Sequence, residues 1–351
     1  MEPPPWSLLE ELGVGLDLGS VDLGYGWTKG SPRLREAVAD WLGGVVDAES
    51  VVVTAGSAEA NLVSVLALVA PGDTVLVDMP NYMQVPGLLR LRGARVVEVW
   101  RRPEESWRLP VWSLVGLIRE ARPRVVFATN PNNPTGAVER GGLWEVAQAA
   151  AEAGAVLVFD EVYRGLELEG GLTPSVLEAA AEAGAEAVAV GGLSKAFGLP
   201  GLRIGWAAAT SRRLADRLWA VKDYTTISPP RLGEAVAVQV LQPSVRGRLL
   251  ELNRAIVVAG LEALREALAG LPVRVCEPSA GAFALVDVDG VEDTMGLAEG
   301  LLERGILVNP GECFGVQGYL RVATGLRGRA RAREAYRRLA TALRGSLLGE
   351  S

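Results

Sequence analysis

The sequence predicts an α/β protein in which a large, mostly parallel β-sheet is joined to a smaller α+β region. Short apolar runs alternate with helical stretches between residues 51 and 208. These runs are apolar at nearly every position, which is typical of parallel strands buried on both faces of a sheet. After residue 228 the pattern changes to a long helical stretch, followed by short strands and an Arg-rich helix.

The large region is expected to build its sheet from seven apolar or β-branched runs. These runs are 51–54, 74–78, 94–99, 124–129, 155–159, 185–190 and 203–208. Helices are expected at 58–70, 84–92 and 143–153. Ligands of such sheets bind beyond the carboxyl ends of the strands, so the loops that follow these strands are the candidate site.

The remainder of the chain is expected to form the smaller region. Its predicted elements are a helical stretch at 232–269, strands at 273–276, 283–288 and 318–322, and an amphipathic, solvent-facing helix at 328–344. The expected division is residues 25–228 for the large region, and residues 1–24 with 229–351 for the smaller one. No repeat or low-complexity linker separates them, so we expect the two to pack closely.

The composition excludes several kinds of partner and site. The 351 residues carry a formal charge of −7 and no basic tract, so neither nucleic acid nor an anionic membrane is an expected partner. The absence of histidine excludes Ser-His-Asp and Cys-His catalysis, and two cysteines are too few for a four-thiolate metal site. No apolar stretch reaches the roughly 20 residues of a membrane span. Without a signal-peptide pattern, and with Cys276 and Cys313 expected to be reduced, the sequence indicates a cytoplasmic protein.

Lysine is rare, which limits the candidates for an amine nucleophile to Lys29, Lys195 and Lys222. Lys195 follows a predicted strand and lies among Gly, Leu, Phe and Pro, where burial would lower its pKa and make the neutral amine available. Lys29 lies in a Gly/Ser/Pro turn and Lys222 beside Asp223, and both are interpreted as ordinary surface lysines.

Three further loops carry polar residues after predicted strands. Ser57 and Ala58 stand where a strand gives way to a helix, a position that suits either a phosphate group or a plain N-cap. The turn 130–136, Asn-Pro-Asn-Asn-Pro-Thr-Gly, is stiff enough to hold an amide side chain in one place. Asp160 ends an apolar strand, three residues before Tyr163, and its carboxylate requires either an internal arginine or a cationic ligand group.

Together these features match the needs of pyridoxal 5′-phosphate. That cofactor requires a Schiff-base lysine, an anionic partner for its pyridinium nitrogen and anion contacts for its phosphate. No Walker A lysine and no G-x-G-x-x-G fingerprint is present, so an ATP-dependent or NAD-dependent enzyme is not favoured.

As a set, the motifs resemble those of the pyridoxal-phosphate-dependent aminotransferases of class I/II, the fold-type-I superfamily of aspartate and aromatic aminotransferases. The resemblance runs from Tyr25 to Arg321 and rests on the Asn-Pro-rich turn, the Asp160–Tyr163 pair, and Ser194–Lys195 with an arginine eight residues after the lysine. It implies a seven-stranded-type large sheet. It also implies transfer of an amino group from an amino acid to a 2-oxo acid, by a ping-pong mechanism through a Schiff base on Lys195.

The resemblance also assigns roles to individual residues. Lys195 resembles the lysine that moves the proton between Cα and C4′, and Asp160 the carboxylate that keeps the ring nitrogen protonated. Arg321 resembles the arginine that binds the substrate carboxylate, and Tyr25 a tyrosine that reaches the phosphate of the neighbouring subunit in a homodimer. The remaining positions resemble cofactor contacts: Tyr163 and Asn133 at O3′, with Asn133 also beside the substrate; Tyr82 stacked on the ring; and Ser57, Ala58, Ser194 and Arg203 around the phosphate.

The sequence departs from the family pattern at two places, and other functions are compatible with the same residues. Gly192 stands where Ser or Thr often precedes the lysine by three residues, and the stretch before Tyr25 is short. The same residues would serve a β-lyase, a decarboxylase, an aldolase or a cyclising synthase. The effector-binding domain of a transcription regulator is a non-catalytic alternative. The sequence does not identify the amino acid or the keto acid.

Overall fold

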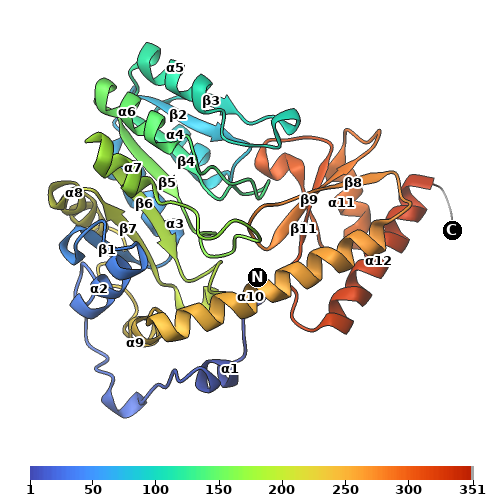
Figure 1. Ribbon diagram of the computed structural model, residues 1–351, viewed down its shortest axis with the longest axis horizontal. Helices are drawn as coiled ribbons and strands as arrows, with labels where there is room; N and C mark the ends of the chain where they lie inside the picture. Colours follow the sequence, from blue (N-terminus) through green and yellow to red (C-terminus); the bar gives the residue numbers. More distant parts are fainter. Residues whose placement is uncertain (349–351) are drawn as a thin grey trace.

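The computed structural model describes residues 1–348, and the last three residues of the predicted smaller region, 349–351, lie outside the described part. The described chain builds a seven-stranded sheet and a separate four-stranded sheet, joined along one side by the long helix α10 (Pro243–Leu268; Figure 1). This arrangement confirms the predicted α/β fold. None of the described helices combines the length and the apolar character needed to cross a membrane.

The large sheet contains all seven predicted strands, each within two residues of its expected bounds. They are β1 (Val51–Thr54), β2 (Thr74–Met79), β3 (Arg95–Trp100), β4 (Val125–Thr129), β5 (Val156–Asp160), β6 (Glu186–Gly192) and β7 (Gly205–Ala209). Their order is β1-β7-β6-β5-β4-β2-β3, and only β7 runs antiparallel to its neighbours. The carboxyl ends of β2, β4, β5 and β6 therefore lie at one edge of the sheet.

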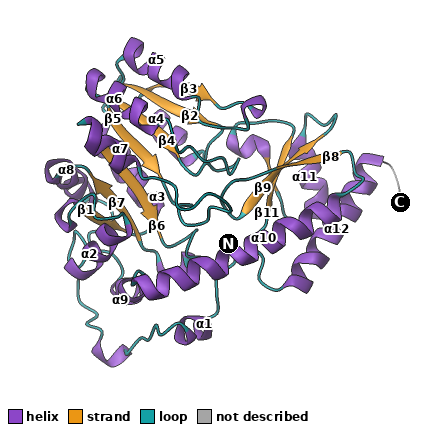
Figure 2. Ribbon diagram, viewed as in Figure 1, coloured by secondary structure: helices purple, strands orange, loops and turns teal. Residues whose placement is uncertain are grey.

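Helices cover both faces of this sheet, as its apolar strands require (Figure 2). One face packs against α3 (Ser57–Leu68), α4 (Gln84–Arg92) and α8 (Arg212–Lys222). The other face packs against α2 (Pro32–Trp41), α5 (Val111–Ala121), α6 (Leu143–Ala153), α7 (Val176–Ala183) and α9 (Arg231–Val240). Short helical segments complete this part of the chain: α1 (Trp6–Glu11) and the 3-10 turns at Leu18–Ser20, Ala48–Ser50, Pro103–Glu105 and Pro200–Leu202.

The small sheet is antiparallel, in the order β10-β11-β9-β8, and packs on α10, α11 (Thr294–Glu303) and α12 (Arg329–Leu348). Its strands are β8 (Val273–Cys276), β9 (Phe283–Val288), β10 (Asn309–Pro310) and β11 (Tyr319–Ala323), with a 3-10 turn at Gly311–Phe314. The arginines of α12 face solvent while Leu339 and Leu343 are buried, so the predicted amphipathic helix is confirmed.

The single helical stretch predicted at 232–269 is wrong in one respect, because the chain breaks it into α9 and α10. The break falls at Leu241 and Gln242, and Pro243 opens the second helix. Proline lacks the N–H group that an uninterrupted helix would need at that position, whereas the first turn of a new helix tolerates it.

The interpretation of Lys29 and Lys222 as surface lysines is also wrong. The side chain of Lys222 is 0% exposed, and its ammonium group donates to the carbonyl of Ile227 at 2.7 Å. Lys29 is buried as well and forms an ion pair with Asp216 at 2.9 Å. A long aliphatic stem can be buried when the ammonium at its end reaches an oxygen, and the neighbouring sequence does not reveal that partner. Both lysines are thus engaged elsewhere.

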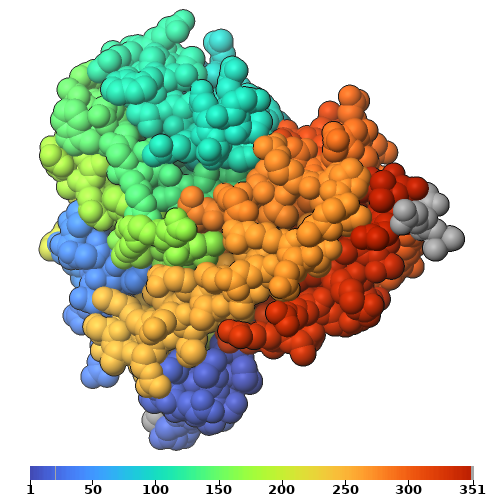
Figure 3. Space-filling model, turned by 45° about the vertical axis from the view of Figure 1, so that its right-hand side comes forward, coloured from blue at the N-terminus to red at the C-terminus, as the bar shows by residue number. Residues whose placement is uncertain are grey.

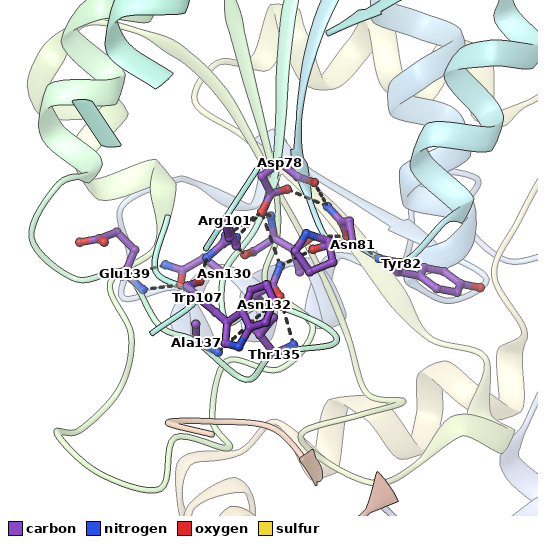
Figure 4. A network of polar contacts seen from close by, with 12 residues as sticks. Asp78, Asn81, Tyr82, Arg101, Trp107, Asn130, Asn132, Thr135, Ala137 and Glu139 are labelled. Carbon is purple, nitrogen blue, oxygen red and sulfur yellow. Dashed lines mark hydrogen bonds and ion pairs between the residues drawn. The ribbon is translucent and has the colours of Figure 1, made fainter. Parts of the chain in front are cut away.

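A buried ion pair joins the carboxyl ends of β2, β3 and β4 (Figure 4). Arg101, directly after β3, donates from Nε and Nη2 to one oxygen of Asp78 at 2.9 and 2.6 Å, and from Nη2 to the carbonyl of Thr129 at 2.9 Å. The amide of Asn81 donates to the other oxygen of Asp78, and its own oxygen accepts the Tyr82 N–H at 2.7 Å. The pair therefore fixes the loop that carries Tyr82.

Replacing Arg101 by methionine is expected to lower the free energy of unfolding by about 3–5 kcal/mol, because Asp78 is left buried without its cation. The matched control is Arg90→Met, since the Arg90–Glu98 ion pair is solvent-exposed and its loss should cost less than about 1 kcal/mol. Urea denaturation measures both changes. Equal costs for the two variants would contradict this account of the pair.

Candidate active site

A cavity of about 410 Å³ lies where the loops of the large sheet meet the small sheet. Apart from Tyr25, every predicted site residue lines it: Ser57, Ala58, Tyr82, Asn133, Asp160, Tyr163, Ser194, Lys195, Arg203 and Arg321. The structure adds polar residues that the sequence analysis missed, chiefly Asn61, Asn309 and Cys313. Asn61 lies inside an apolar helix pattern and Asn309 in a two-residue strand, so neither had a signal in the sequence.

Tyr25 is the one predicted site residue that stays outside the cavity. It is 84% exposed and precedes α2 on the surface of the single chain. Its expected role, a contact to the phosphate in a neighbouring subunit, concerns a second chain and stays a prediction.

Asp160 presents a carboxylate to the cavity at the end of β5. One oxygen accepts the side-chain N–H of Asn61 at 2.9 Å, and the other accepts the backbone N–H of Val162 at 3.1 Å. Burial raises the pKa of Asp160, and the hydrogen bond from Asn61 is the largest opposing effect. Within residues 1–348 no arginine or lysine forms an ion pair with this carboxylate. Of the two partners that the sequence allowed for Asp160, the internal arginine is therefore not found among these residues.

Lys195 extends into the same cavity from a tight loop after β6. Two backbone hydrogen bonds close the loop. The N–H of Leu199 donates to the carbonyl of Leu193 at 2.9 Å, and the N–H of Gly198 donates to the carbonyl of Lys195 at 3.1 Å. The pKa of Lys195 is lowered, first by burial and then by the charge of Arg321, while Asp160 acts in the opposite direction. Burial and the charge of Arg321 thus favour the neutral amine that a nucleophile requires, and Asp160 only partly opposes them.

The glycine three residues before Lys195 has a steric explanation. A Cβ atom on Gly192 would lie 3.0 Å from the carbonyl oxygen of Ile204 and 3.6 Å from the N–H nitrogen of Ser57. The antiparallel pairing of β6 with β7 leaves little room for a hydroxyl-bearing side chain at this position. The departure from the family pattern is therefore built into the local packing.

The start of α3 forms an anion-binding corner with Arg203. The N-cap of α3 is Gly56, which has no side chain to cap the helix, so Ser57 is the first helical residue and the plain N-cap interpretation is wrong. Gly56 has φ +92°, and a Cβ there would lie 2.3 Å from the Arg203 guanidinium. Arg203 donates to the carbonyl of Ala55 at 3.0 Å and lies beside Ser194. A helix N-terminus and a guanidinium together suit a phosphate group.

Arg321 forms the opposite wall of the cavity, on β11. Its Nη1 donates to the side-chain oxygen of Asn133 and its Nη2 to that of Asn309, both at 2.9 Å. The guanidinium carbon lies 4.6 Å from the ring centre of Phe314 and 5.2 Å from that of Phe283. The two amides and two rings hold the guanidinium plane in one orientation, as two-pronged recognition of a carboxylate requires.

Two tyrosines complete the lining. Tyr163 is buried edge-on against Phe283, and burial raises its pKa to about 12, so its phenol remains protonated at neutral pH. Tyr82 is half-exposed, and its ring points away from the Asp78–Arg101 pair that fixes its backbone (Figure 4).

The donor set fits pyridoxal phosphate. Lys195 and the half-buried carboxylate of Asp160 line the same cavity. Among residues 1–348 no arginine pairs with that carboxylate, and the side-chain oxygen of Asn61 beside it has no hydrogen-bond partner. The cofactor brings a cationic ring nitrogen and an aldehyde, and its phosphate suits the corner at α3. Among residues 1–348 no group of three or more Cys, Asp or Glu side chains could hold a metal ion.

Comparison with known proteins agrees with this geometry. Residues 13–339 match the family model of class I and II aminotransferases. An aspartate/prephenate aminotransferase of Thermus thermophilus is 31% identical over 307 residues, which cover 85% of this chain and 78% of that protein. Capreomycidine synthase of Streptomyces vinaceus is 34% identical over 304 residues, covering 84% of this chain and 74% of that protein.

A solved structure extends the comparison to the whole chain. The α-aminoadipate aminotransferase of Thermus thermophilus, in complex with N-(5′-phosphopyridoxyl)-L-leucine, has a TM-score of 0.86 at 28% identity. It covers 100% of this chain, and this chain covers 92% of it. By sequence and by fold, the chain belongs to the class I and II aminotransferase family.

Proposed function

We propose that Lys195, Asp160 and Arg321 carry out the amino-group transfer, from an amino acid to a 2-oxo acid, that membership of this family implies. The observation that carries the proposal is the half-buried carboxylate of Asp160, which has no ion-pair partner among residues 1–348 and lies in the same cavity as the amine of Lys195. Pyridoxal phosphate, when bound, supplies the aldehyde and the electron-withdrawing ring that the reaction needs. The residues of the chain supply binding, orientation and proton transfer.

Lys195 is the proposed base. Burial and the charge of Arg321 lower its pKa and so favour the neutral amine. With pyridoxal phosphate bound, that amine would accept the proton from the substrate Cα and would return it at the cofactor carbon C4′. Asp160 keeps the ring nitrogen protonated, and Asn61 supports it in that role by favouring the ionised carboxylate.

The other residues of the cavity are proposed to bind and orient. Tyr163 and Asn133 would contact the ring oxygen O3′, and the ring of Tyr82 would stack on the cofactor. Ser57, Ala58, Ser194 and Arg203 hold the phosphate at the N-terminus of α3. Arg321 binds the substrate carboxylate, with Asn133 beside it, and the contact of its guanidinium with the rings of Phe283 and Phe314 supports that assignment.

We propose that the chain acts as a homodimer with shared sites, to which Tyr25 contributes from the neighbouring subunit. Its support is an exposed apolar run in which Leu23, Tyr25 and Trp27 all face solvent in the single chain. We also propose the division into a cofactor-binding region, 25–228, and a smaller region formed by the rest. A cytoplasmic location is a proposal as well, supported by the two unpaired cysteines.

A second candidate function is different chemistry at the substrate Cα with the same cofactor. The match to a protein named capreomycidine synthase, at 34% identity, favours keeping this candidate. A β-lyase, a decarboxylase, an aldolase or a cyclising synthase would use Lys195 and Asp160 in the same way, because these residues act before the reactions diverge.

A half-reaction separates the two functions. Holoprotein mixed with each of the common amino acids in turn is expected to convert its cofactor to the pyridoxamine form with at least one of them, and a 2-oxo acid should restore it. Absorbance spectra and stoichiometric keto-acid assays follow the exchange. Ammonia, carbon dioxide or a cyclised product without that interconversion would assign the chain to the second candidate.

The replacement Asp160→Asn should retain a folded protein with bound cofactor but lower kcat by about 10²–10³-fold, because a neutral amide does not hold the ring nitrogen cationic. Asp216→Asn is the control, since Asp216 pairs with Lys29 away from the cavity. Steady-state kinetics on cofactor-loaded protein measure both. Full activity of Asp160→Asn would refute its role.

Arg321→Lys should raise KM for amino acids more than it lowers kcat. The ammonium keeps the charge but loses the planar, two-pronged contact, and about tenfold in KM is the expected scale for one charge-assisted hydrogen bond. Arg337→Lys, on the exposed face of α12, should leave KM unchanged. An unchanged KM for Arg321→Lys would place carboxylate recognition elsewhere in the cavity.

A further inference from the structure

A buried amide on α10 links two loops that the cavity depends on. Asn253 lies near the middle of the helix, and its side chain is 0% exposed. Its Nδ2 donates to the carbonyl of Ala196 at 3.0 Å, and its Oδ1 accepts from Nη2 of Arg327 at 2.7 Å. Asn253 is not part of the cavity lining, so it can reach the reaction only through its neighbours.

The two partners of Asn253 belong to the segments that carry the proposed reacting and binding groups. Ala196 directly follows Lys195 in the tight loop after β6. Arg327 follows β11, six residues after Arg321. Between them, α10 passes from the large sheet to the small one (Figure 1) and lies beside α12 on the surface (Figure 3). Arg327, Asn253 and Ala196 thus connect the two sheets at the cavity.

The connection is anchored at its outer end by Glu2. The guanidinium of Arg327 donates to the carbonyl of Glu2 at 3.0 Å, and the backbone N–H of Arg327 donates to the Glu2 carboxylate at 2.7 Å. The N–H of Glu2 donates in turn to the carbonyl of Gly325 at 2.8 Å. These hydrogen bonds fix the orientation of the Arg327 guanidinium. The side-chain amide of Asn253 therefore binds to a rigidly held partner.

We propose that Asn253 is a positioning residue, which holds the Lys195 loop at a fixed place relative to the strand that carries Arg321. The inference rests on the roles proposed above for Lys195 and Arg321. A substrate bound through its carboxylate must present its Cα to the amine, so the separation of these two groups sets the geometry of proton transfer. Displacement by about 1 Å is enough to cost roughly 10²-fold in rate.

The chemistry of the position explains why an amide is present. Asparagine offers a donor and an acceptor at once, so it satisfies the carbonyl of Ala196 and the guanidinium of Arg327 together. Aspartate has the same shape and still accepts from Arg327, but it has no N–H for Ala196 and places a second oxygen against that carbonyl. Asn253→Asp therefore breaks one link and keeps the other.

The test compares Asn253→Asp and Arg327→Met with the wild type, each loaded with pyridoxal phosphate. Arg327→Met breaks the link from the other side without adding a charge. Both variants are expected to fold and to bind cofactor, to lose tenfold or more in kcat, and to change less in KM. Gln242→Glu is the control, since it makes the same amide-to-carboxylate change on the exposed residue that precedes α10.

A second readout needs no cofactor. In unloaded protein, the amide hydrogens of Gly198 and Leu199, which close the Lys195 loop, are expected to exchange with deuterium faster in both variants than in the wild type or in Gln242→Glu. If both variants fold and keep wild-type kcat and exchange rates, the proposal is wrong. A loss of kcat in Asn253→Asp but not in Arg327→Met would also overturn the proposal. Such a loss would come from the added negative charge and not from the broken connection.

The experiments distinguish a failure of the proposed function from a failure of the proposed role of Asn253. A wild-type protein that neither binds pyridoxal phosphate nor transfers amino groups would refute the function. The exchange rates of unloaded protein would still decide whether Asn253 holds the loop.

Discussion

The candidate site depends on one constraint: a carboxylate at the end of a buried parallel strand needs a positive charge opposite it. Asp160 has hydrogen bonds from Asn61 and Val162 but no arginine within the described chain, whereas Asp78, at the end of a nearby strand, has Arg101. The two carboxylates show the two ways to satisfy the same need. Asp78 is neutralised inside the protein and supports the loops, whereas Asp160 faces the cavity, where the cationic group of a ligand can pair with it.

The large sheet brings the groups of the site together through its topology. Parallel strands end at one edge, so residues far apart in the sequence, from Ser57 to Arg203, meet in one cavity. The small sheet then supplies Arg321 from the other side, held by Asn133 of the large-sheet region. The geometry that matters is therefore the relation between the two sheets, and Asn253 on α10 lies where that relation can be fixed.

Much of the fold could be predicted because its physical signals are local. Apolar runs such as 125–128 and 156–159 are visible in the sequence, and polar site residues such as Asp160 follow such runs directly. Helices such as α5 and α8 were missed although their apolar residues recur with helical spacing, so this part of the signal was present in the sequence and was overlooked. Lys222 was misjudged, and Asn61 and Asn253 were overlooked, because a polar residue in a helix reveals its partner only after the chain has folded.

The central claim is that the amine of Lys195 binds the cofactor. The most direct measurement reduces holoprotein with borohydride, which fixes the cofactor to the amine that holds it, and maps the added mass to a peptide. We expect the mass on the peptide that contains Lys195, and none on those with Lys29 or Lys222, whose ammonium groups are already bound elsewhere. An unaltered mass, or cofactor on another lysine, would contradict the account.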